Sequence, residues 1–251
     1  MDDPAGGVTL FPSLAPMPVP ASIDLRCGDV RDVIASLPAD SIDVAFFDPP
    51  WEYDQRVGGN GPHVSEHYAC LPMATILDHL GLVRAKMRRG GRCVLWTTHS
   101  QEPELSLNLE RADDGAMLAG WRYVTGGAWA KVGEEGAACG RGAPGIGYHC
   151  LSSEAEPWWL LLADGPHGRA NVAGCRVIPR HRGRGEMHSA KPIEYQREMI
   201  RGFCPPDGLV FDAYAGLGSV AVAALAEGRN YVGAEIDPGR WADARRNVAR
   251  A

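Results

Sequence analysis

Ten residues decide how this chain folds: Ile42-Asp43-Val44-Ala45-Phe46-Phe47-Asp48-Pro49-Pro50-Trp51. The apolar run before Asp48 is typical of a strand that is buried on both faces. Pro49 and Pro50 cannot continue a central strand, so the chain turns out of the sheet at that point. The turn presents a carboxylate, two carbonyls of residues without an N–H group, and an aromatic ring. This combination predicts a ligand cleft at the end of a strand.

A flat base with an exocyclic amine fits these groups. Its N–H groups need acceptors such as the Asp48 carboxylate and the Pro49 carbonyl, and its ring needs an aromatic face such as Trp51. Taken alone, the four residues from Asp48 to Trp51 are equally consistent with a strand-ending turn that an aspartate caps. The choice between the two depends on the rest of the chain.

Composition narrows the class of protein. The length of 251 residues suits one α/β domain, and the net charge of −6 means that any polyanion contact requires a local basic patch. Seven cysteines, none spaced Cys-x-x-Cys, favour reduced thiols over disulfides or a zinc site. The chain has no apolar stretch of about 20 residues, which a membrane span needs, and its start lacks a signal-peptide pattern. We therefore expect a cytoplasmic protein without a membrane segment.

Short apolar runs alternate with amphipathic stretches, which predicts an α/β fold with a mostly parallel sheet flanked by helices. Expected strands are Ile23–Arg26, Ile42–Phe47, Arg92–Thr97, Tyr123–Lys131, Trp158–Ala163, Leu209–Ala213 and Asn230–Glu235. Expected helices are Arg31–Leu37, Met73–Arg88, Pro103–Leu118, Ile193–Phe203, Ser219–Glu227 and Pro238–Ala249. Residues 1–21 are expected to be an irregular tail, and 22–251 one domain. Segments at about 52–71, 133–150 and 165–189 lack periodicity and are expected to be substrate loops.

A second motif lies toward the C-terminus. Gly216 and Gly218 follow an expected strand and open a helix N-terminus toward a ligand, although a ligand-free turn has the same pattern. The next strand ends in Glu235, 19 residues after Gly216, where an acid can accept hydrogen bonds from a ribose. The spacing matches an NAD fingerprint, but only 16 residues follow Glu235, too few for an ordinary dinucleotide fold.

This conflict disappears if the catalytic half of the fold comes first and the nucleoside-binding half last. In such a permuted order Asp48 and Gly216 lie at the ends of adjacent strands, and the site binds one adenosine. A nucleoside site beside an acceptor for an amine favours methyl transfer from S-adenosylmethionine to an amino group.

Three motifs in this order resemble the permuted, β-class amino-methyltransferases: Asp48-Pro49-Pro50-Trp51, His188-Ser189-Ala190-Lys191-Pro192 and Gly216-Leu217-Gly218. The likeness spans about Ile23 to Asn247. It points to the Asp-Pro-Pro-Trp branch, which includes bacterial and phage adenine-N6 enzymes and the eukaryotic mRNA adenosine methyltransferases. The resemblance implies a Rossmann-like methyltransferase fold with circularly permuted motif order, S-adenosylmethionine as cofactor, and methylation of adenine N6 in DNA.

The same resemblance implies roles for single residues. Asp48 and the Pro49 carbonyl would hold the target amine while Trp51 stacks on the base. Lys191 would meet the carboxylate of the cofactor, Glu235 its ribose, and Asp29 its adenine. The structural alternatives are a solvated Lys191 before a helix and an Asp29 that caps a helix.

The predicted site falls into three groups. Predicted catalytic residues are Asp48, Pro49, Pro50 and Trp51. Predicted cofactor-binding residues are Asp29, Asp48, Lys191, Asp212, Gly216, Gly218, Ser219 and Glu235. Predicted substrate-binding residues are Trp51, Tyr53, Arg180, Arg182, Arg184 and His188.

Substrate choice rests on weaker signals. The run from Pro166 to Lys191 is rich in arginine and predicts contacts to phosphates, with a solvated loop as the alternative. Compact size favours DNA over RNA by analogy alone. His63 and His67 have no further ligands at suitable spacing, so no metal is expected. A homodimer and a heterodimer with a recognition subunit both remain open.

Four other functions remain as alternatives. The first two are an RNA adenosine N6 methyltransferase and an N4-cytosine DNA methyltransferase, whose relatives more often carry Ser at the position of Asp48. The third is a noncatalytic nucleic-acid-binding subunit, which the complete set of motif residues disfavours. The fourth is an enzyme acting on a small aromatic amine, which would need no basic loop. An NAD-dependent reductase is disfavoured by the chain order.

Overall fold

The computed structural model describes residues 21–51, 70–98, 101–112, 115–132, 155–166, 170, 172–179 and 191–251. The predicted tail up to Pro20 and most of the three predicted substrate loops lie outside these residues.

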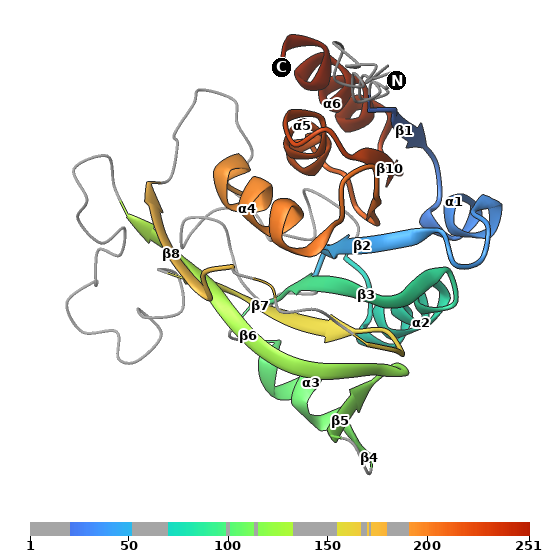
Figure 1. Ribbon diagram of the computed structural model, residues 1–251, viewed down its shortest axis with the longest axis vertical. Helices are drawn as coiled ribbons and strands as arrows, with labels where there is room; N and C mark the ends of the chain where they lie inside the picture. Colours follow the sequence, from blue (N-terminus) through green and yellow to red (C-terminus); the bar gives the residue numbers. More distant parts are fainter. Residues whose placement is uncertain are drawn as a thin grey trace, which may run out of the picture.

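Ten strands and six helices occupy the described residues (Figure 1). The strands are β1 (Ile23–Cys27), β2 (Ile42–Phe47), β3 (Met87–Trp96), β4 (Glu110–Ala112), β5 (Gly115–Leu118), β6 (Trp121–Val132), β7 (Ala155–Leu162), β8 (Cys175–Pro179), β9 (Leu209–Asp212) and β10 (Asn230–Glu235). The helices are α1 (Val30–Ser36), α2 (Met73–Arg84), α3 (Glu102–Leu107), α4 (Ile193–Phe203), α5 (Ser219–Ala226) and α6 (Pro238–Arg250).

The strands form one sheet in the order β1-β10-β9-β2-β3-β7-β6-β5-β4, and β8 pairs with β6. Among the described strands only β5 and β7 run against the others, so the mostly parallel direction predicted from the sequence is confirmed. The predicted bounds of β2, β10 and α4 agree with the structure.

Helices cover both faces of the sheet (Figure 1). On one face α1, α2 and α3 contribute buried residues such as Ile34, Leu80 and Leu105 to a shared core. On the other face α4 and α5 contribute residues such as Met199 and Ala221 to a second core. Every residue of β2 is buried, and its apolar side chains enter the two cores, which explains why Asp43 is the one polar residue in this strand.

The order of strands confirms the permuted arrangement. β2 pairs with β9, with Phe46 opposite Asp212, and β9 pairs with β10 on its other side. The chain leaves this point in both directions across the sheet, so the carboxyl ends of β2 and β9 flank a topological switch point, where α/β proteins bind ligands. Asp48 and the Gly216 turn therefore lie at the same edge.

Three predicted segments differ from the structure. The predicted helix Pro103–Leu118 ends at Leu107, where Asn108 donates a side-chain hydrogen bond to the Glu104 carbonyl at 2.8 Å, and β4 and β5 follow as an antiparallel pair. The predicted helix Met73–Arg88 ends at Arg84, since Met87 already pairs with Ile42.

The predicted loop 165–189 contains β8. Its register on β6 is supported by the Trp129 indole, which donates to the Ile178 carbonyl at 3.0 Å. The Tyr195 hydroxyl, on α4, donates to the Ala173 carbonyl at 2.8 Å just before this strand. These contacts come from segments distant in the sequence, and periodicity within the segment does not reveal them.

Candidate active site

A pocket opens at the switch point between β2 and β9. It encloses about 480 Å³, open solvent at its mouth included. Its walls include six polar or glycine residues that the site depends on: Asp48, Lys191, Gln196, Asp212, Gly216 and Ser219. Five of these six were predicted from the sequence, and Gln196 was not.

The turn after β2 is held by its own backbone. The Pro49 carbonyl accepts the Trp51 N–H at 2.8 Å, and the Pro50 carbonyl accepts the Leu71 N–H at 2.8 Å. Each carbonyl oxygen has a second lone pair, so the Pro49 oxygen keeps the capacity to accept from a ligand.

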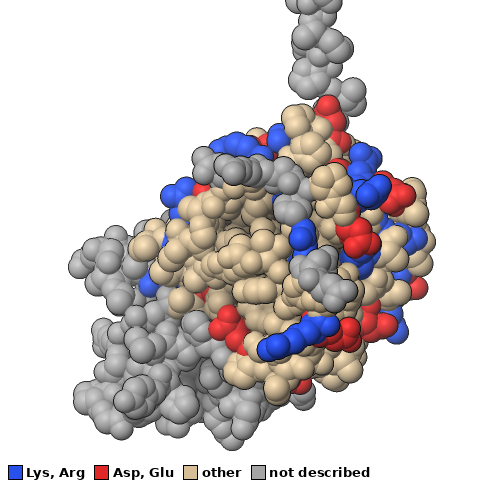
Figure 2. All heavy atoms as spheres, turned by 60° about the horizontal axis from the view of Figure 1, so that its bottom comes forward, with Lys and Arg blue, Asp and Glu red and all other residues tan. Residues whose placement is uncertain are grey.

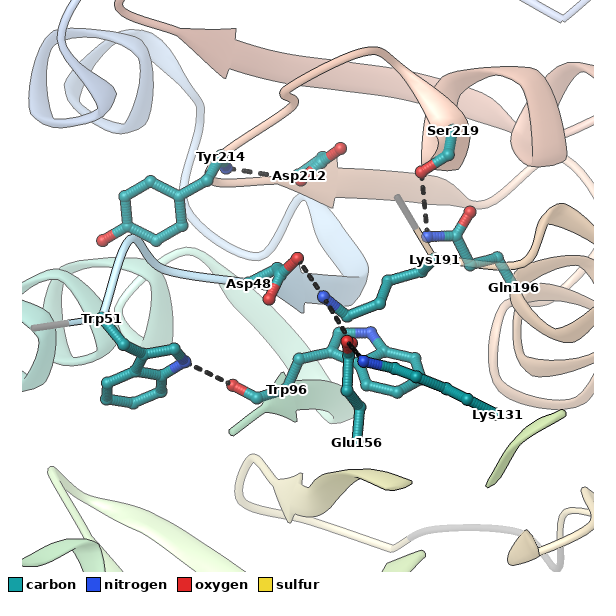
Figure 3. Close-up of polar contacts among 10 residues, drawn as sticks. All are labelled: Asp48, Trp51, Trp96, Lys131, Glu156, Lys191, Gln196, Asp212, Tyr214 and Ser219. Carbon is teal, nitrogen blue, oxygen red and sulfur yellow. Dashed lines mark hydrogen bonds and ion pairs between the residues drawn. The ribbon is translucent and has the colours of Figure 1, made fainter. Parts of the chain in front are cut away.

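The Trp51 side chain lies beneath this turn. It is 3% exposed, packs in the core under α2, and donates its indole N–H to the Trp96 carbonyl at 3.2 Å (Figure 3). In this conformation the ring supports the turn and does not offer a face to the pocket. Stacking of Trp51 on a base, as predicted, would require the ring to become exposed.

Lys191 links Asp48 to two residues that the sequence did not single out. Its ammonium lies 2.5 Å from Asp48 Oδ2 and 3.1 Å from Glu156 Oε2, and Glu156 also pairs with Lys131 (Figure 3). The ammonium also lies 5.3 Å from the centre of the Trp96 ring. Lys191 thus makes an ion pair with the predicted catalytic acid, and its contact with a cofactor carboxylate stays a prediction.

Burial and pairing act against each other on the ionisable groups of this cluster. Burial raises the pKa of Asp48 above its ordinary value, although Lys191 opposes the rise. For Lys191 burial alone would lower the pKa, but Asp48 and Glu156 outweigh it and raise the pKa instead. Burial would likewise raise the pKa of Glu156, but Lys191 and Lys131 outweigh it. The cluster therefore keeps its lysine and its glutamate charged at neutral pH.

The glycine turn after β9 has the predicted geometry. Gly216 has φ +53° and Gly218 has φ +80°, a region that favours glycine. A Cβ on Gly218 would lie 3.0 Å from the Ala244 Cβ of α6, whereas none of the described atoms lies within 4 Å of a Cβ built on Gly216. The backbone at Gly216 thus leaves room for a ligand to approach. Ser219 begins α5, and its hydroxyl accepts from the Gln196 amide at 3.1 Å.

Glu235 at the end of β10 and Asp29 just after β1 lie near each other, since Cys27, the last residue of β1, pairs with Glu235. Glu235 accepts the Gly216 N–H at 2.8 Å and the Asp237 N–H at 2.9 Å, and burial raises its pKa. Asp29 caps α1 through the Arg31 N–H at 2.8 Å and also binds the Arg31 guanidinium, which lowers the Asp29 pKa to about 2. Asp29 is thus the cap of α1, and its predicted contact with adenine stays a prediction.

Asp212 lies buried at the end of β9. Its carboxylate accepts from the Tyr231 hydroxyl at 3.0 Å and from the Tyr214 N–H at 3.3 Å. Burial raises its pKa from 3.8 to about 7. Asp212 is thus a group that titrates near neutral pH in the wall of the pocket.

Asp212 predicts a dependence of stability on pH. Because its pKa is raised in the folded state, the folded protein holds a proton that the unfolded chain releases between pH 3.8 and about 7. The free energy of unfolding contributed by this group therefore falls as the pH rises through that window, by up to about 1.4 kcal/mol per pH unit. We expect Asp212→Asn to remove this contribution. Urea denaturation across the window checks it, and parallel curves for the variant and the wild type would contradict it.

Several predicted residues lie outside the described part of the chain, and their roles stay predictions. They are Tyr53, Arg180, Arg182, Arg184 and His188, together with the histidines His63 and His67. Within the described residues, His, Cys, Asp and Glu form no group of three or more that could hold a metal ion. None of the helices described is long and apolar enough to cross a bilayer.

Comparison with known proteins gives this arrangement a context. A family model described as DNA methylase matches residues 157–246, from β7 to α6. TTHA0409 of Thermus thermophilus, a predicted DNA modification methylase solved with S-adenosyl-L-methionine, is 20% identical, with a TM-score of 0.59 over 91% of this chain and 93% of the other. The PvuII DNA methyltransferase, specific for cytosine N4, is 14% identical, with a TM-score of 0.60 over 90% and 86%. The chain has a methyltransferase fold.

The methyltransferase fold predicted from the sequence is therefore confirmed. A sequence relative, YubD of Escherichia coli (strain K12), described as a predicted methylase, is 41% identical over 54 residues. The match covers 21% of this chain and 24% of YubD. The family model covers β9, the glycine turn and Glu235, whereas Asp48 and its turn precede the matched segment.

Proposed function

We propose that this chain transfers a methyl group from S-adenosylmethionine to the exocyclic amine of a DNA base, and that the base is adenine, methylated at N6. One observation carries the proposal: Asp48 and the glycine turn at Gly216 line the same pocket at the switch point of the sheet. A carboxylate that can bind an amine thus lies beside a turn that can bind a nucleoside.

The pocket suits S-adenosylmethionine on chemical grounds. Gln196 is 1% exposed, and its side-chain oxygen in the pocket wall has no hydrogen-bond partner among the described residues. Such an oxygen can accept from the ammonium of an amino-acid moiety. Glu235 retains lone pairs for ribose hydroxyls, and Asp48 and Asp212 suit a ligand that carries positive charge. The similar structure of TTHA0409 with S-adenosyl-L-methionine supports the same cofactor.

The residues of the site would act by positioning and by charge. When bound, S-adenosylmethionine supplies a methyl group that its sulfonium has already activated. Asp48 and the Pro49 carbonyl would accept the two N–H groups of the amine and direct its lone pair toward the methyl carbon. The Asp48 carboxylate would also stabilise the positive charge that develops on the nitrogen. The methylated nitrogen then loses its proton to water, so Asp48 need not act as a strong base.

Adenine and cytosine are distinguished by the first residue of the turn. In the family that the sequence resembles, Asp at the position of Asp48 is typical of the adenine enzymes. The similarity to the cytosine-N4-specific PvuII enzyme favours N4-cytosine as the second candidate. The DNA methylase description of the matching family model supports DNA, and RNA stays the alternative substrate.

Two nucleic-acid pools test the base directly. One single-stranded DNA pool contains no adenine and the other contains no cytosine, and an RNA pair is built in the same way. With S-adenosylmethionine labelled in its methyl group, we expect label only in the DNA pool that contains adenine. Label in the pool that lacks adenine would favour cytosine N4. Label confined to the RNA pools would show that the substrate is RNA and not DNA. Measurable cofactor binding without transfer to any pool would favour a noncatalytic subunit or a small amine substrate.

The arginines at 180, 182 and 184 are proposed to contact phosphates. They lie close together in the sequence of an acidic chain. On the face that Figure 2 presents, the Lys and Arg side chains of the described residues are interspersed with Asp and Glu. Replacing all three with glutamine is expected to lower the slope of log affinity against log salt by up to about 3. As a control, Arg197→Gln with Arg201→Gln removes two cations already paired with Glu227. Equal slopes for both variants and the wild type would refute the contact.

A further inference from the structure

Four side chains of alternating charge run from the pocket into the protein. Asp48 follows β2, Lys191 precedes α4, Glu156 lies in β7 and Lys131 in β6, and each is paired with the next (Figure 3). Asp48 is the most exposed member of the row: its side chain is 36% exposed, whereas those of Lys191, Glu156 and Lys131 are 6%, 16% and 10% exposed. Asp48 is the end that faces the pocket.

A purely structural role is a poor explanation for this row. Removing charges from water is costly, and apolar residues of similar volume often stabilise a core as well or better than buried ion pairs. Here the row crosses between two strands that otherwise carry large apolar side chains, such as Trp129 and Trp158. Its connection to the pocket through Asp48 suggests a function in the chemistry.

The contact of Lys191 with Asp48 sets a specific problem. A single-sided contact with Oδ2 leaves Oδ1 as the oxygen for an amine, whereas a lysine free to turn would cover both oxygens. A full ion pair would also cancel the negative charge that the amine needs as it becomes cationic. Glu156 forms an ion pair with the same ammonium at 3.1 Å, so it can restrain the position of the ammonium and offset its charge.

We propose that Glu156 is a positioning residue for methyl transfer, which holds Lys191 so that one oxygen of Asp48 stays available to the target amine. This inference rests on the proposed function and adds a residue to it. During transfer the carbon–sulfur bond breaks, the carbon–nitrogen bond forms, and the positive charge moves from sulfur to nitrogen before the proton leaves to water. Near that nitrogen, Asp48, Lys191 and Glu156 together carry one negative charge, and Lys131 balances it farther away.

The charged groups around Asp48 act on its pKa in known directions. After burial, Lys191 lowers it, Glu156 raises it and Lys131 lowers it. From β9, Asp212 faces the same pocket and is coupled to Asp48 by repulsion between like charges. Removing Glu156 must therefore lower the pKa of Asp48, and removing Lys131 must raise it.

These opposite directions give the test. Turnover needs the ionised form of Asp48, so the acid limb of the kcat/KM profile reports its pKa. We expect Glu156→Gln to move that limb to lower pH and Lys131→Met to move it to higher pH. In Glu156→Gln we also expect kcat to fall by about 100-fold, the typical cost of a misplaced reacting group, while the affinity for S-adenosylmethionine stays within a few-fold.

Two further variants exclude loss of structure as the cause. The double variant Glu156→Gln with Lys131→Met removes one charge of each sign, and its acid limb is expected to return toward that of the wild type while kcat stays low. Glu198→Gln is the control, because it removes one glutamate charge from an ion pair, with Arg176, that lies outside the pocket lining. It is expected to leave both the limb and kcat unchanged.

A second readout separates this inference from the proposed function. Titration of the Asp48 carboxyl carbon by NMR reports the same order of pKa values without any turnover. Shifts of Glu156→Gln and Lys131→Met in opposite directions support the inference by either readout. Coincident or parallel titrations in the three proteins would overturn it, even if the wild type methylates DNA. Absence of methylation by the wild type counts against the proposed function, and the order seen by NMR still decides the charge coupling.

Discussion

Replacing Asp48 with alanine is expected to abolish methyl transfer, with a loss of at least about 10³-fold in kcat, comparable to removing a group that stabilises developing charge. The variant loses both the acceptor for the amine and the negative charge beside the nitrogen. The affinity for S-adenosylmethionine is expected to stay within a few-fold, because the glycine turn and Glu235 are untouched. Single-turnover rates and calorimetric binding check the two parts separately.

Asp43→Asn is the matched control for this prediction. Asp43 is an acid within β2, the strand that Asp48 follows. It lies outside the pocket lining and accepts the Leu209 N–H at 2.8 Å. Asparagine can keep that hydrogen bond, so turnover is expected to persist. A rate within tenfold of the wild type in Asp48→Ala would remove Asp48 from the mechanism.

Of the substitutions proposed for this protein, Lys191→Met is expected to lower the free energy of unfolding the most. The ammonium is the shared partner of two carboxylates, and its removal leaves Asp48 without its paired cation and leaves Glu156 with Lys131 alone. Breaking a buried ion pair on one side typically lowers the free energy of unfolding by about 3–5 kcal/mol. The apolar stem of methionine retains much of the packing against Trp96, so the loss reports charge more than volume.

The pH dependence of that loss identifies its cause. In the wild type the raised pKa of Lys191 keeps its contribution in place below its ordinary value of 10.5, and it is lost only as the pH rises through the folded value. The lowered pKa of Glu156 keeps its contribution in place above 4.5 and loses it in more acidic solution. In Lys191→Met, burial raises both carboxyl pKa values, so protonation relieves the variant as the pH falls.

The difference in unfolding free energy between this variant and the wild type is therefore expected to narrow from about pH 8 to about pH 5. Denaturation by urea at several pH values measures it. A difference that stays constant over this range would assign the loss to packing and not to charge.

Sequence patterns predicted the parts of the fold that depend on local residues. The apolar run of β2, the glycine turn before α5 and the Asp237-Pro238 start of α6 each follow from residues next to one another. The hairpin of β4 and β5 and the edge strand β8 do not follow from neighbouring residues, because β5 and β8 each pair with β6. Amphipathic spacing alone made the segment after Pro103 read as one long helix.

The site shows the same division. Asp48, Gly216 and Glu235 were found because motif order places them at adjacent strand ends. The pairing of Lys191 was not, since it depends on Glu156 and Lys131, which the register of β6 on β7 brings side by side. The available signal in the sequence was one lysine near the end of β6 and one glutamate near the start of β7, each beside large apolar residues. The sequence allowed two interpretations of Asp29, a helix cap and an adenine contact. The geometry of the Arg31 contacts shows that Asp29 caps the helix.

The most direct measurement is to identify the methylated nucleoside. The purified protein is incubated with S-adenosylmethionine and separate pools of double-stranded DNA, single-stranded DNA and RNA, with Asp48→Ala in parallel, and each pool is digested and examined by mass spectrometry. The proposed function predicts N6-methyldeoxyadenosine from a DNA pool with the wild type and none with the variant. Methylated cytosine, or product from RNA alone, would contradict the choice of base or substrate. An equal yield of product from Asp48→Ala would contradict the site itself.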